Sequence, residues 1–309
     1  MNLDNKKIWL AGHKGMLGTF LAKKLIAKNT NLLTCSRQEV DLLDQKQVEQ
    51  WIYNNKPEIV IISAAKVGGI YANSNYPSEF IYENTMIQSN IIHNSYKNGV
   101  KNLIMLGASC AYPKNINEAI SEEMLGIGLP ETTNQWYSYA KLNGIKMCQA
   151  YSEQYKLNYF SIIPTNLYGP GDNFNSKLSH VIPSLISRFH KAKTQNQDKI
   201  LIWGTGNPIR EFMYVEAAAD GIIYLIENLT KHNLLNLGTS EEITIRNLAH
   251  KIALIVGFKG KIEFDKSKAD GVHKKLLDIS KLKKFNWKHQ TNLDEGLKKT
   301  YDWFLKNVI

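Results

Sequence analysis

The chain has 309 residues, enough to bury a large core as one large domain or as two that share a cleft. Its three cysteines, Cys35, Cys110 and Cys148, are an odd number without metal-type spacing, which fits a reducing compartment rather than a disulfide framework. The formal charge of +10 is spread along the chain without a Lys/Arg block, so neither nucleic-acid binding nor a metal site is expected.

The start of the chain carries no visible targeting signal. Met1–Lys7 is polar, and the first apolar run, Ile8–Gly12, is far too short for a signal peptide or a membrane span. We therefore expect a cytoplasmic protein that does not enter membranes.

The first half alternates short apolar runs with longer amphipathic stretches, which predicts a parallel sheet flanked by helices. The continuous apolar run Ile59–Ser63 is typical of a strand buried on both faces. Strands are predicted at Ile8–Ala11, Leu32–Cys35, Ile59–Ser63, Leu103–Leu106 and Tyr159–Pro164. Helices are predicted at Met16–Lys28, Gln45–Asn54, Phe80–Asn98 and Tyr137–Tyr155.

Beyond about Tyr168 this alternation loosens, which indicates a smaller C-terminal lobe after the main sheet. Loop-rich pieces there surround or precede three predicted helices, at Val181–Lys193, Val215–Leu229 and Ile245–Val256. We expect the helices Val215–Leu229 and Ile245–Val256 to pack on both lobes. No internal repeat, low-complexity tract or flexible linker is visible.

Gly12, Gly15 and Gly18 follow the first predicted strand and open the first predicted helix. These positions suit a tight turn, a close approach of backbone to pyrophosphate, and close packing of helix on sheet. The pyrophosphate would lie at the helix N-terminus. A bland glycine turn is the alternative, but the placement between strand and helix favours a Rossmann-type dinucleotide site.

The end of the second predicted strand distinguishes the two nicotinamide cofactors. An acidic residue there would bind the ribose 2′-hydroxyl of NAD, whereas the run here is Thr34-Cys35-Ser36-Arg37. A cation beside small polar residues fits the 2′-phosphate of NADPH, and Lys14 in the glycine loop offers a second phosphate contact. The alternative is that Arg37 is a solvated loop charge.

Tyr137 and Lys141 are four residues apart on a predicted helix, so both side chains leave the same face. A nearby ammonium would lower the pKa of Tyr137 and make it a better proton donor near neutral pH. The pair alone is a frequent chance match. Its value comes from its position, after the strand Leu103–Leu106 and a loop that holds Ser109 and Cys110.

Over nearly its whole length the chain resembles the GDP-L-fucose synthase family of extended short-chain dehydrogenases/reductases. The resemblance is carried by the runs Ala64–Ile70, Pro164–Pro170, Ser179–Pro183, Trp203–Gly206 and Arg210–Phe212. It implies an α/β fold with a Rossmann-type doubly wound parallel sheet and a smaller C-terminal substrate-binding lobe. The NADP-binding domain would take residues 1–168 and about 212–240, and the GDP-sugar lobe residues 169–211 and 241–309.

The resemblance also implies a two-part reaction on a GDP-4-keto-6-deoxy sugar. Carbons 3 and 5 are epimerised, and NADPH then reduces the carbon 4 ketone. Tyr137 would protonate the alkoxide, and Lys141 would hold the nicotinamide ribose and tune Tyr137. Cys110 and His180 match the family's epimerisation pair. Apart from the resemblance, Cys110 would more often be a buried apolar core residue, and His180 a loop histidine with its hydrogen bonds satisfied.

The binding residues are likewise implied by the resemblance. Cofactor contacts are expected from Gly12, Lys14, Gly15, Met16, Gly18, Arg37, Ala64, Lys141, Pro164, Asn166, Leu167 and His180. Substrate contacts are expected from Asn166, Arg188, Trp203, Arg210 and Lys275, with Asp270 in a similar stretch. The alternatives are a core role for Trp203 and a helix-surface charge for Arg188.

One position departs from the family pattern. The hydroxyl that assists the catalytic tyrosine maps to Ala108, with Ser109 as its neighbour. Either Ser109 takes over or about 2 to 4 kcal/mol of transition-state stabilisation is lost. Similar reductases act on GDP-4-keto-heptoses and leave epimerisation to a separate enzyme, so a reductase-only enzyme is one alternative and a non-catalytic NADP-binding regulator another.

Similar enzymes form homodimers through the helices that correspond to Phe80–Asn98 and Tyr137–Tyr155. The same association is expected here.

A different enzyme class, an epimerase with a trapped NAD, would need an acidic residue where Arg37 stands.

Overall fold

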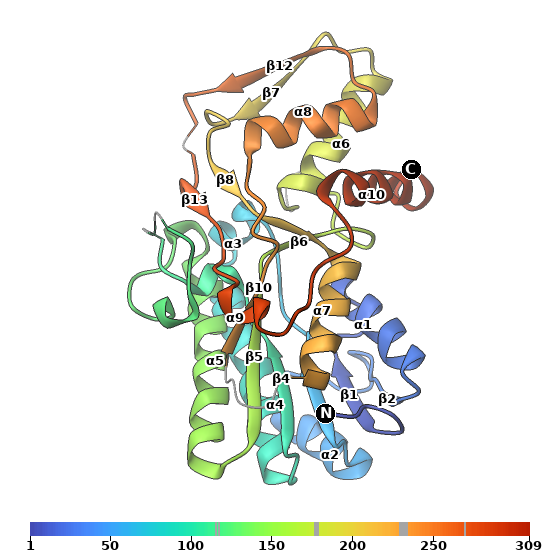
Figure 1. The fold of residues 1–309 in the computed structure, drawn as a ribbon, viewed down its shortest axis with the longest axis vertical. Coiled ribbons are helices and arrows are strands. Elements are labelled where there is room, and N and C mark those ends of the chain that lie inside the picture. The colour runs from blue at the N-terminus through green and yellow to red at the C-terminus, as the bar shows by residue number, and fades with distance from the viewer. Residues whose placement is uncertain (115, 117, 176–178, 229–233, 269) are drawn as a thin grey trace.

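A computed structural model describes residues 1–309 except 115, 117, 176–178, 229–233 and 269 (Figure 1). Its centre is a six-stranded parallel sheet in the order β10-β5-β4-β3-β1-β2. The strands are β1 (Lys7–Ala11), β2 (Asn31–Leu33), β3 (Ile59–Ile62), β4 (Asn102–Leu106), β5 (Asn158–Pro164) and β10 (Leu234–Leu237). The chain reverses its direction of travel across the sheet between β1 and β3, so the predicted Rossmann-type doubly wound sheet is confirmed.

Helices cover both faces of this sheet. On one face α1 (Met16–Ala27) packs beside α7 (Val215–Asn228), and on the other α4 (Pro77–Lys97) packs between α2 (Gln45–Asn55) and α5 (Gln135–Tyr155). Side chains alternate along each strand. Ile8 and Leu10 therefore enter the apolar core between the sheet and the helices α1 and α7, whereas Trp9 and Ala11 enter the core on the opposite face. Because both layers are apolar, the strands read as continuous hydrophobic runs.

The upper part of the molecule in Figure 1 holds the remaining larger elements. These are α6 (Val181–Thr194), α8 (Ile245–Val256), α10 (Leu293–Asn307), and the parallel pair β7 (Lys199–Trp203) and β12 (Lys261–Asp265). Two small sheets lie between this part and the main sheet. They are β6 (Asn166–Tyr168) with β9 (Phe212–Tyr214), and β11 (Ile243–Thr244) with β8 (Ile209–Arg210) and β13 (Lys274–Lys275).

Most predicted elements are present within a few residues of their expected bounds. The strand expected at Leu32–Cys35 is an exception, because β2 already ends at Leu33 and the Glu39 carboxylate accepts the Ser36 N–H at 2.6 Å, which turns the chain away from the sheet. Several elements were not predicted. They are the long helix α10, the main-sheet strand β10 and the other strands after β5. The short pieces α3 (Ile70–Asn75), α9 (Ser280–Lys283) and the one-turn helices η1 (Ser109–Ala111), η2 (Glu122–Met124) and η3 (Thr132–Asn134) were not predicted either. Leu229, the last residue of one predicted helix, lies outside the described residues.

Glu211, which precedes β9, joins the main sheet to the upper part. Its fully buried carboxylate accepts the N–H groups of Thr239 at 2.5 Å, Ser240 at 2.8 Å and Leu277 at 3.0 Å. Three N–H donors satisfy a buried carboxylate without a cation. The neighbouring Arg210 is therefore fixed relative to the end of β10.

None of the helices in the described ranges is long and apolar enough to cross a membrane.

Candidate active site

The glycine loop between β1 and α1 is shaped by contacts that exclude side chains. Gly12 has φ +93°, and a Cβ there would lie 2.5 Å from the Ala64 backbone nitrogen. A Cβ on Gly18 would lie 2.0 Å from the Gly12 carbonyl oxygen. Both glycines are therefore required by close packing of backbone on backbone, as the motif predicts.

The N-terminus of α1 is left open toward this loop. Gly15 precedes α1 without a side-chain cap, the first turn has no acidic residue, and a Cβ on Gly15 would meet nothing closer than 3.5 Å. From the other side, Gly171 approaches Met16, since its Cβ would lie 3.7 Å from the Met16 Cα. Uncapped N–H groups beside a side-chain-free loop fit the pyrophosphate of a dinucleotide.

The turn after β2 lies beside the glycine loop, because His13 and Lys14 both act on the pKa of the Glu39 carboxyl in that turn. Two hydrogen bonds from Ser36 are the main cause that lowers this pKa. Arg37 follows with a side chain that is 77% exposed, and its guanidinium Nη2 lies 3.7 Å from the Glu83 carboxylate of α4. An exposed cation at this place fits a 2′-phosphate.

Helix α5 positions Tyr137 and Lys141 as predicted. Lys141 is buried, and its Nζ donates to the Leu106 carbonyl oxygen at the end of β4 at 2.9 Å and lies 5.8 Å from the centre of the Tyr137 ring. Burial lowers the pKa of Lys141 to about 8. The predicted lowering of the Tyr137 pKa is wrong for this structure, because burial and the nearby Cys110 raise it.

The one-turn helix η1 packs against the start of α5 and buries Ser109 and Cys110. Cys110 affects the pKa of Tyr137, of Lys141 and of Lys275 in β13, so these four side chains converge from three elements. Burial is the main cause that lowers the pKa of Lys275.

His180 lies apart from this group, exposed at the start of α6. It acts on Asp172: burial raises the pKa of the Asp172 carboxyl, and His180 partly opposes that rise. Among the described residues, no hydrogen bond joins His180 to Cys110, so their role as an epimerisation pair stays a prediction.

The predicted GDP end contains two adjacent cations. Lys275 of β13 lies opposite Arg210 of β8, whose guanidinium Nη1 donates to the Val272 carbonyl oxygen at 2.7 Å. Burial lowers the pKa of Arg210, and the carboxylates of Asp270 and Glu131 oppose that shift. Two partly buried cations side by side favour an anionic ligand.

Other predicted substrate residues have mixed environments. Trp203 is 72% exposed, which excludes the core alternative, and the Lys268 Nζ lies 5.9 Å from its ring. Arg188 donates to the Leu201 carbonyl oxygen, and burial lowers its pKa. The amide of Asn166 donates to the Glu211 carbonyl oxygen at 2.8 Å.

Asp270 and Arg246 are held by local structure. The Asp270 carboxylate accepts the Thr205 N–H at 2.9 Å and its hydroxyl at 2.6 Å. Arg246 donates to the Thr205 carbonyl oxygen at 2.6 Å and lies 4.0 Å from the centre of the Phe264 ring. These contacts shape the loop after β7, and they engage Arg246 in structure rather than ligand binding.

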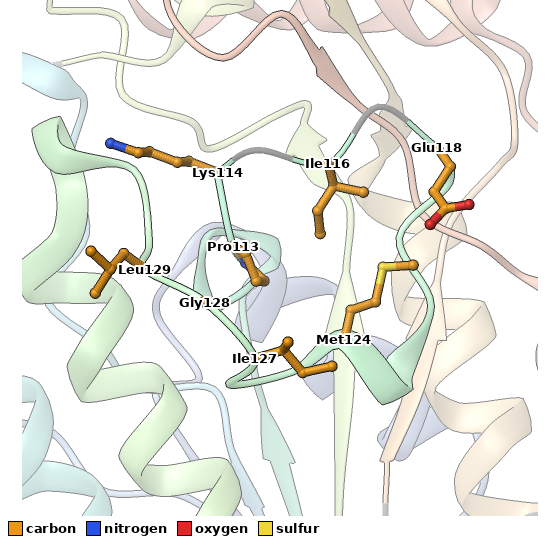
Figure 2. Close-up of a pocket in the computed structure, with 8 residues that line it drawn as sticks. All are labelled: Pro113, Lys114, Ile116, Glu118, Met124, Ile127, Gly128 and Leu129. Atoms are coloured by element: carbon orange, nitrogen blue, oxygen red, sulfur yellow. The ribbon is translucent and has the colours of Figure 1, made fainter.

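A cavity of about 760 Å³ lies on the segment between η1 and α5. Figure 2 shows its wall of mainly apolar side chains, among them Pro113, Ile116, Met124 and Ile127. No predicted site residue lines it. It is therefore distinct from the group around Cys110 and Tyr137.

Comparison with known proteins decides the family. Residues 8–238 match the model of the NAD dependent epimerase/dehydratase family. The chain belongs to this family. Within it, the chain is 45% identical over 306 residues to a GDP-L-fucose synthase of Sinorhizobium fredii, which covers 99% of this chain and 98% of that one. The predicted resemblance is confirmed.

Solved structures of family members agree. A GDP-6-OMe-4-keto-L-xylo-heptose reductase from Campylobacter jejuni superposes with a TM-score of 0.91 at 34% identity, with 98% of each chain covered. MlghC, a GDP-mannoheptose C4 reductase from the same organism with NADP bound, gives a TM-score of 0.87 at 36% identity and covers 97% of this chain and 98% of that one.

Proposed function

We propose that this protein is an NADPH-dependent reductase of the 4-keto group of a GDP-4-keto-6-deoxy sugar or a related GDP-4-keto-heptose. One observation supports it most: the Tyr137–Lys141 pair is held at the carboxyl end of β4 in a chain similar throughout to GDP-L-fucose synthases and GDP-heptose reductases. In open α/β sheets this edge is where ligands bind.

The chemistry follows from the environment of the pair. The glycine loop and the N-terminus of α1 would hold NADPH, which would supply a hydride for the carbonyl carbon. Tyr137 donates its phenolic proton to the carbonyl oxygen, and its raised pKa keeps that proton in place at neutral pH. The Lys141 ammonium, still mostly protonated at pH 7, stabilises the phenolate that remains.

The upper part of the molecule would bind the GDP end. Arg210 and Lys275 would face the diphosphate, since an anion offsets the cost of burying two cations. Arg188 and Asn166 would add donors, and the exposed Trp203 ring a flat packing surface. This assignment keeps the proposed division into an NADP-binding domain and a GDP-sugar lobe.

Epimerisation at carbons 3 and 5 would use Cys110, which lies beside Tyr137, together with His180. A reductase-only enzyme acting on a GDP-4-keto-heptose is the second candidate. One observation favours it: Ala108 stands where the family has the hydroxyl that assists the catalytic tyrosine.

The test uses purified protein with each ketosugar. NADPH oxidation with a GDP-4-keto-6-deoxy sugar or a GDP-4-keto-heptose identifies the reductase and its preferred substrate; oxidation with neither leaves only an NADP-binding protein. Incubation in deuterated water without NADPH separates the two candidates. Deuterium at carbons 3 and 5 indicates the epimerase half, and its absence indicates reduction alone.

We also propose a cytoplasmic homodimer formed through α4 and α5. Aromatic side chains line the contact between α4 and α5, which we call the outer seam. The rings of Tyr96 and Tyr155 stack there with their centres 4.1 Å apart, and the Tyr151 hydroxyl lies 2.7 Å from the His93 imidazole. Covering such a surface with a second copy removes apolar area from water.

A further inference from the structure

Glu83 lies in the second turn of α4 between two cations from other parts of the chain. Its Oε1 is 2.5 Å from the Lys66 Nζ, and its Oε2 is 3.7 Å from the Arg37 Nη2. Lys66 follows β3 and Arg37 follows β2, so three segments meet at one carboxylate. Glu83 belongs neither to the glycine motif nor to the runs that carry the family resemblance.

The contact with Lys66 is built into the fold. Asn84, beside Glu83, is buried and exchanges two hydrogen bonds with the Lys66 backbone: its Oδ1 accepts the Lys66 N–H at 2.9 Å, and its Nδ2 donates to the Lys66 carbonyl oxygen at 3.0 Å. The loop after β3 is therefore fixed to α4 at this point. Glu83 itself is 19% exposed, which makes it the least exposed charged group of the three.

The charges leave Arg37 free to bind an anion. Lys66 is the closer partner and neutralises Glu83, so two positive groups and one negative group leave a net charge of +1. A carboxylate at one edge of a guanidinium leaves donors on its other edges. Because Arg37 is 77% exposed, this looser pair adds little to stability, and its effect is on where the guanidinium points.

We propose that Glu83 is a positioning residue that sets the preference for NADPH over NADH. It holds the Arg37 guanidinium where the 2′-phosphate of NADPH binds, with Lys66 keeping Glu83 in place. An untethered arginine would lose more side-chain freedom on binding the phosphate. The proposal rests on the proposed function only through the assignment of Arg37 to that phosphate.

Calorimetric titration of NADP⁺ and NAD⁺ into purified protein tests this without any ketosugar. Glu83→Gln keeps the size of the side chain and an oxygen acceptor for Lys66. We expect it to weaken NADP⁺ binding roughly threefold to tenfold and to leave NAD⁺ binding unchanged. Glu79→Gln is the matched control, since it removes the same charge from an exposed site one turn earlier on α4 and should change neither affinity.

A second pair of variants shows whether Glu83 acts through Arg37. Arg37→Gln should weaken NADP⁺ binding more than Glu83→Gln does, and the double variant should bind NADP⁺ no more weakly than Arg37→Gln alone. Equal weakening of both cofactors by Glu83→Gln, unchanged or tighter NADP⁺ binding, or losses that multiply in the double variant would each overturn the proposal. If Arg37→Gln leaves the preference intact, the assignment of Arg37 fails as well, whatever Glu83→Gln does.

Discussion

Around Cys110, the surroundings of a side chain decide its proposed role more than its residue type does. Lys141 and Lys275 are both lysines whose pKa burial lowers. Lys141 donates to the end of β4 beside Tyr137, the proposed proton donor, whereas Lys275 lies opposite Arg210. The first is placed to stabilise a phenolate and the second to meet an anion.

The pKa of Lys141 predicts how the reduction depends on pH. The ammonium that stabilises the Tyr137 phenolate is present below the lowered pKa of about 8 and is lost as the pH rises through it, while Tyr137 stays protonated. We expect kcat/KM for reduction to fall above about pH 8. The Lys141→Met variant should be slow at every pH and lack this step, and a wild-type rate that keeps rising past pH 9 would contradict the role.

Ser109 is expected to replace the hydroxyl missing at Ala108. It is buried in η1 next to Cys110, which itself lies close to Tyr137. Ser109→Ala should lower kcat/KM by about thirtyfold or more, equivalent to about 2 kcal/mol of transition-state stabilisation. Ala108→Ser serves as the comparison, and an unchanged rate in Ser109→Ala would show that the Ser109 hydroxyl does not assist Tyr137.

The sequence was informative where function depends on local spacing. Gly12, Gly18 and the Tyr137–Lys141 pair are each defined within one strand–turn–helix unit or one helix, and the structure places them as the motifs indicate. Glu83 gave no signal, because its role depends on contact with Lys66 and Arg37, which are 17 and 46 positions away. The raised pKa of Tyr137 was missed for the same reason, since it comes from tertiary burial.

At the scale of the elements, the backbone packs very closely where β1 joins α1. Substitutions at two glycines there should distinguish an effect on stability from an effect on cofactor binding. Gly18→Ala would drive a methyl group into the Gly12 carbonyl and should lower Tm by several degrees. Gly15→Ala has room in the free protein, where the nearest atom is 3.5 Å away, but its methyl group would enter the space left for the pyrophosphate.

We therefore expect Gly15→Ala to keep a Tm near wild type while weakening NADP⁺ binding about tenfold or more. Calorimetry and thermal unfolding of the two variants measure this. Equal stability and equal binding in both would mean that the loop does not hold the cofactor.

Most long helices were predictable, although the 15-residue helix α10 was not, and the shortest elements were not predictable. The helix predicted from its pattern at Ile245–Val256 has the same bounds in the structure, where Thr244 caps its start and Gly257 ends it with φ +79°. The small sheet of β11, β8 and β13 has two residues per strand, and its pairing is set by contacts between distant segments. No local sequence pattern predicts strands of this kind.

At the scale of the whole molecule, the doubly wound sheet brings the glycine loop after β1 and the Tyr137–Lys141 pair near the end of β4 to one edge. The upper part adds Arg210 and Lys275, fixed to the main sheet through Glu211. The proposed cofactor loop and proton donor thus lie at one edge of the main sheet, and the upper part supplies the cations proposed to bind the diphosphate.

The outer seam of α4 and α5 predicts the state of assembly. Light scattering should give twice the chain mass of 35.2 kDa. Tyr155→Asp puts a charge into the aromatic seam and should shift the protein toward monomer, because an unpaired charge in an interface is costly. A wild-type monomer at micromolar concentration would contradict the proposed homodimer.

The most direct measurement concerns the phenol of Tyr137. Wild-type protein and Tyr137→Phe are compared for NADPH oxidation with the preferred GDP-ketosugar, and calorimetry confirms that both bind NADP⁺ equally. We expect the variant to lose at least about a hundredfold in kcat with its cofactor affinity unchanged. Oxidation at the wild-type rate would show that another group protonates the sugar oxygen and would contradict the proposed mechanism.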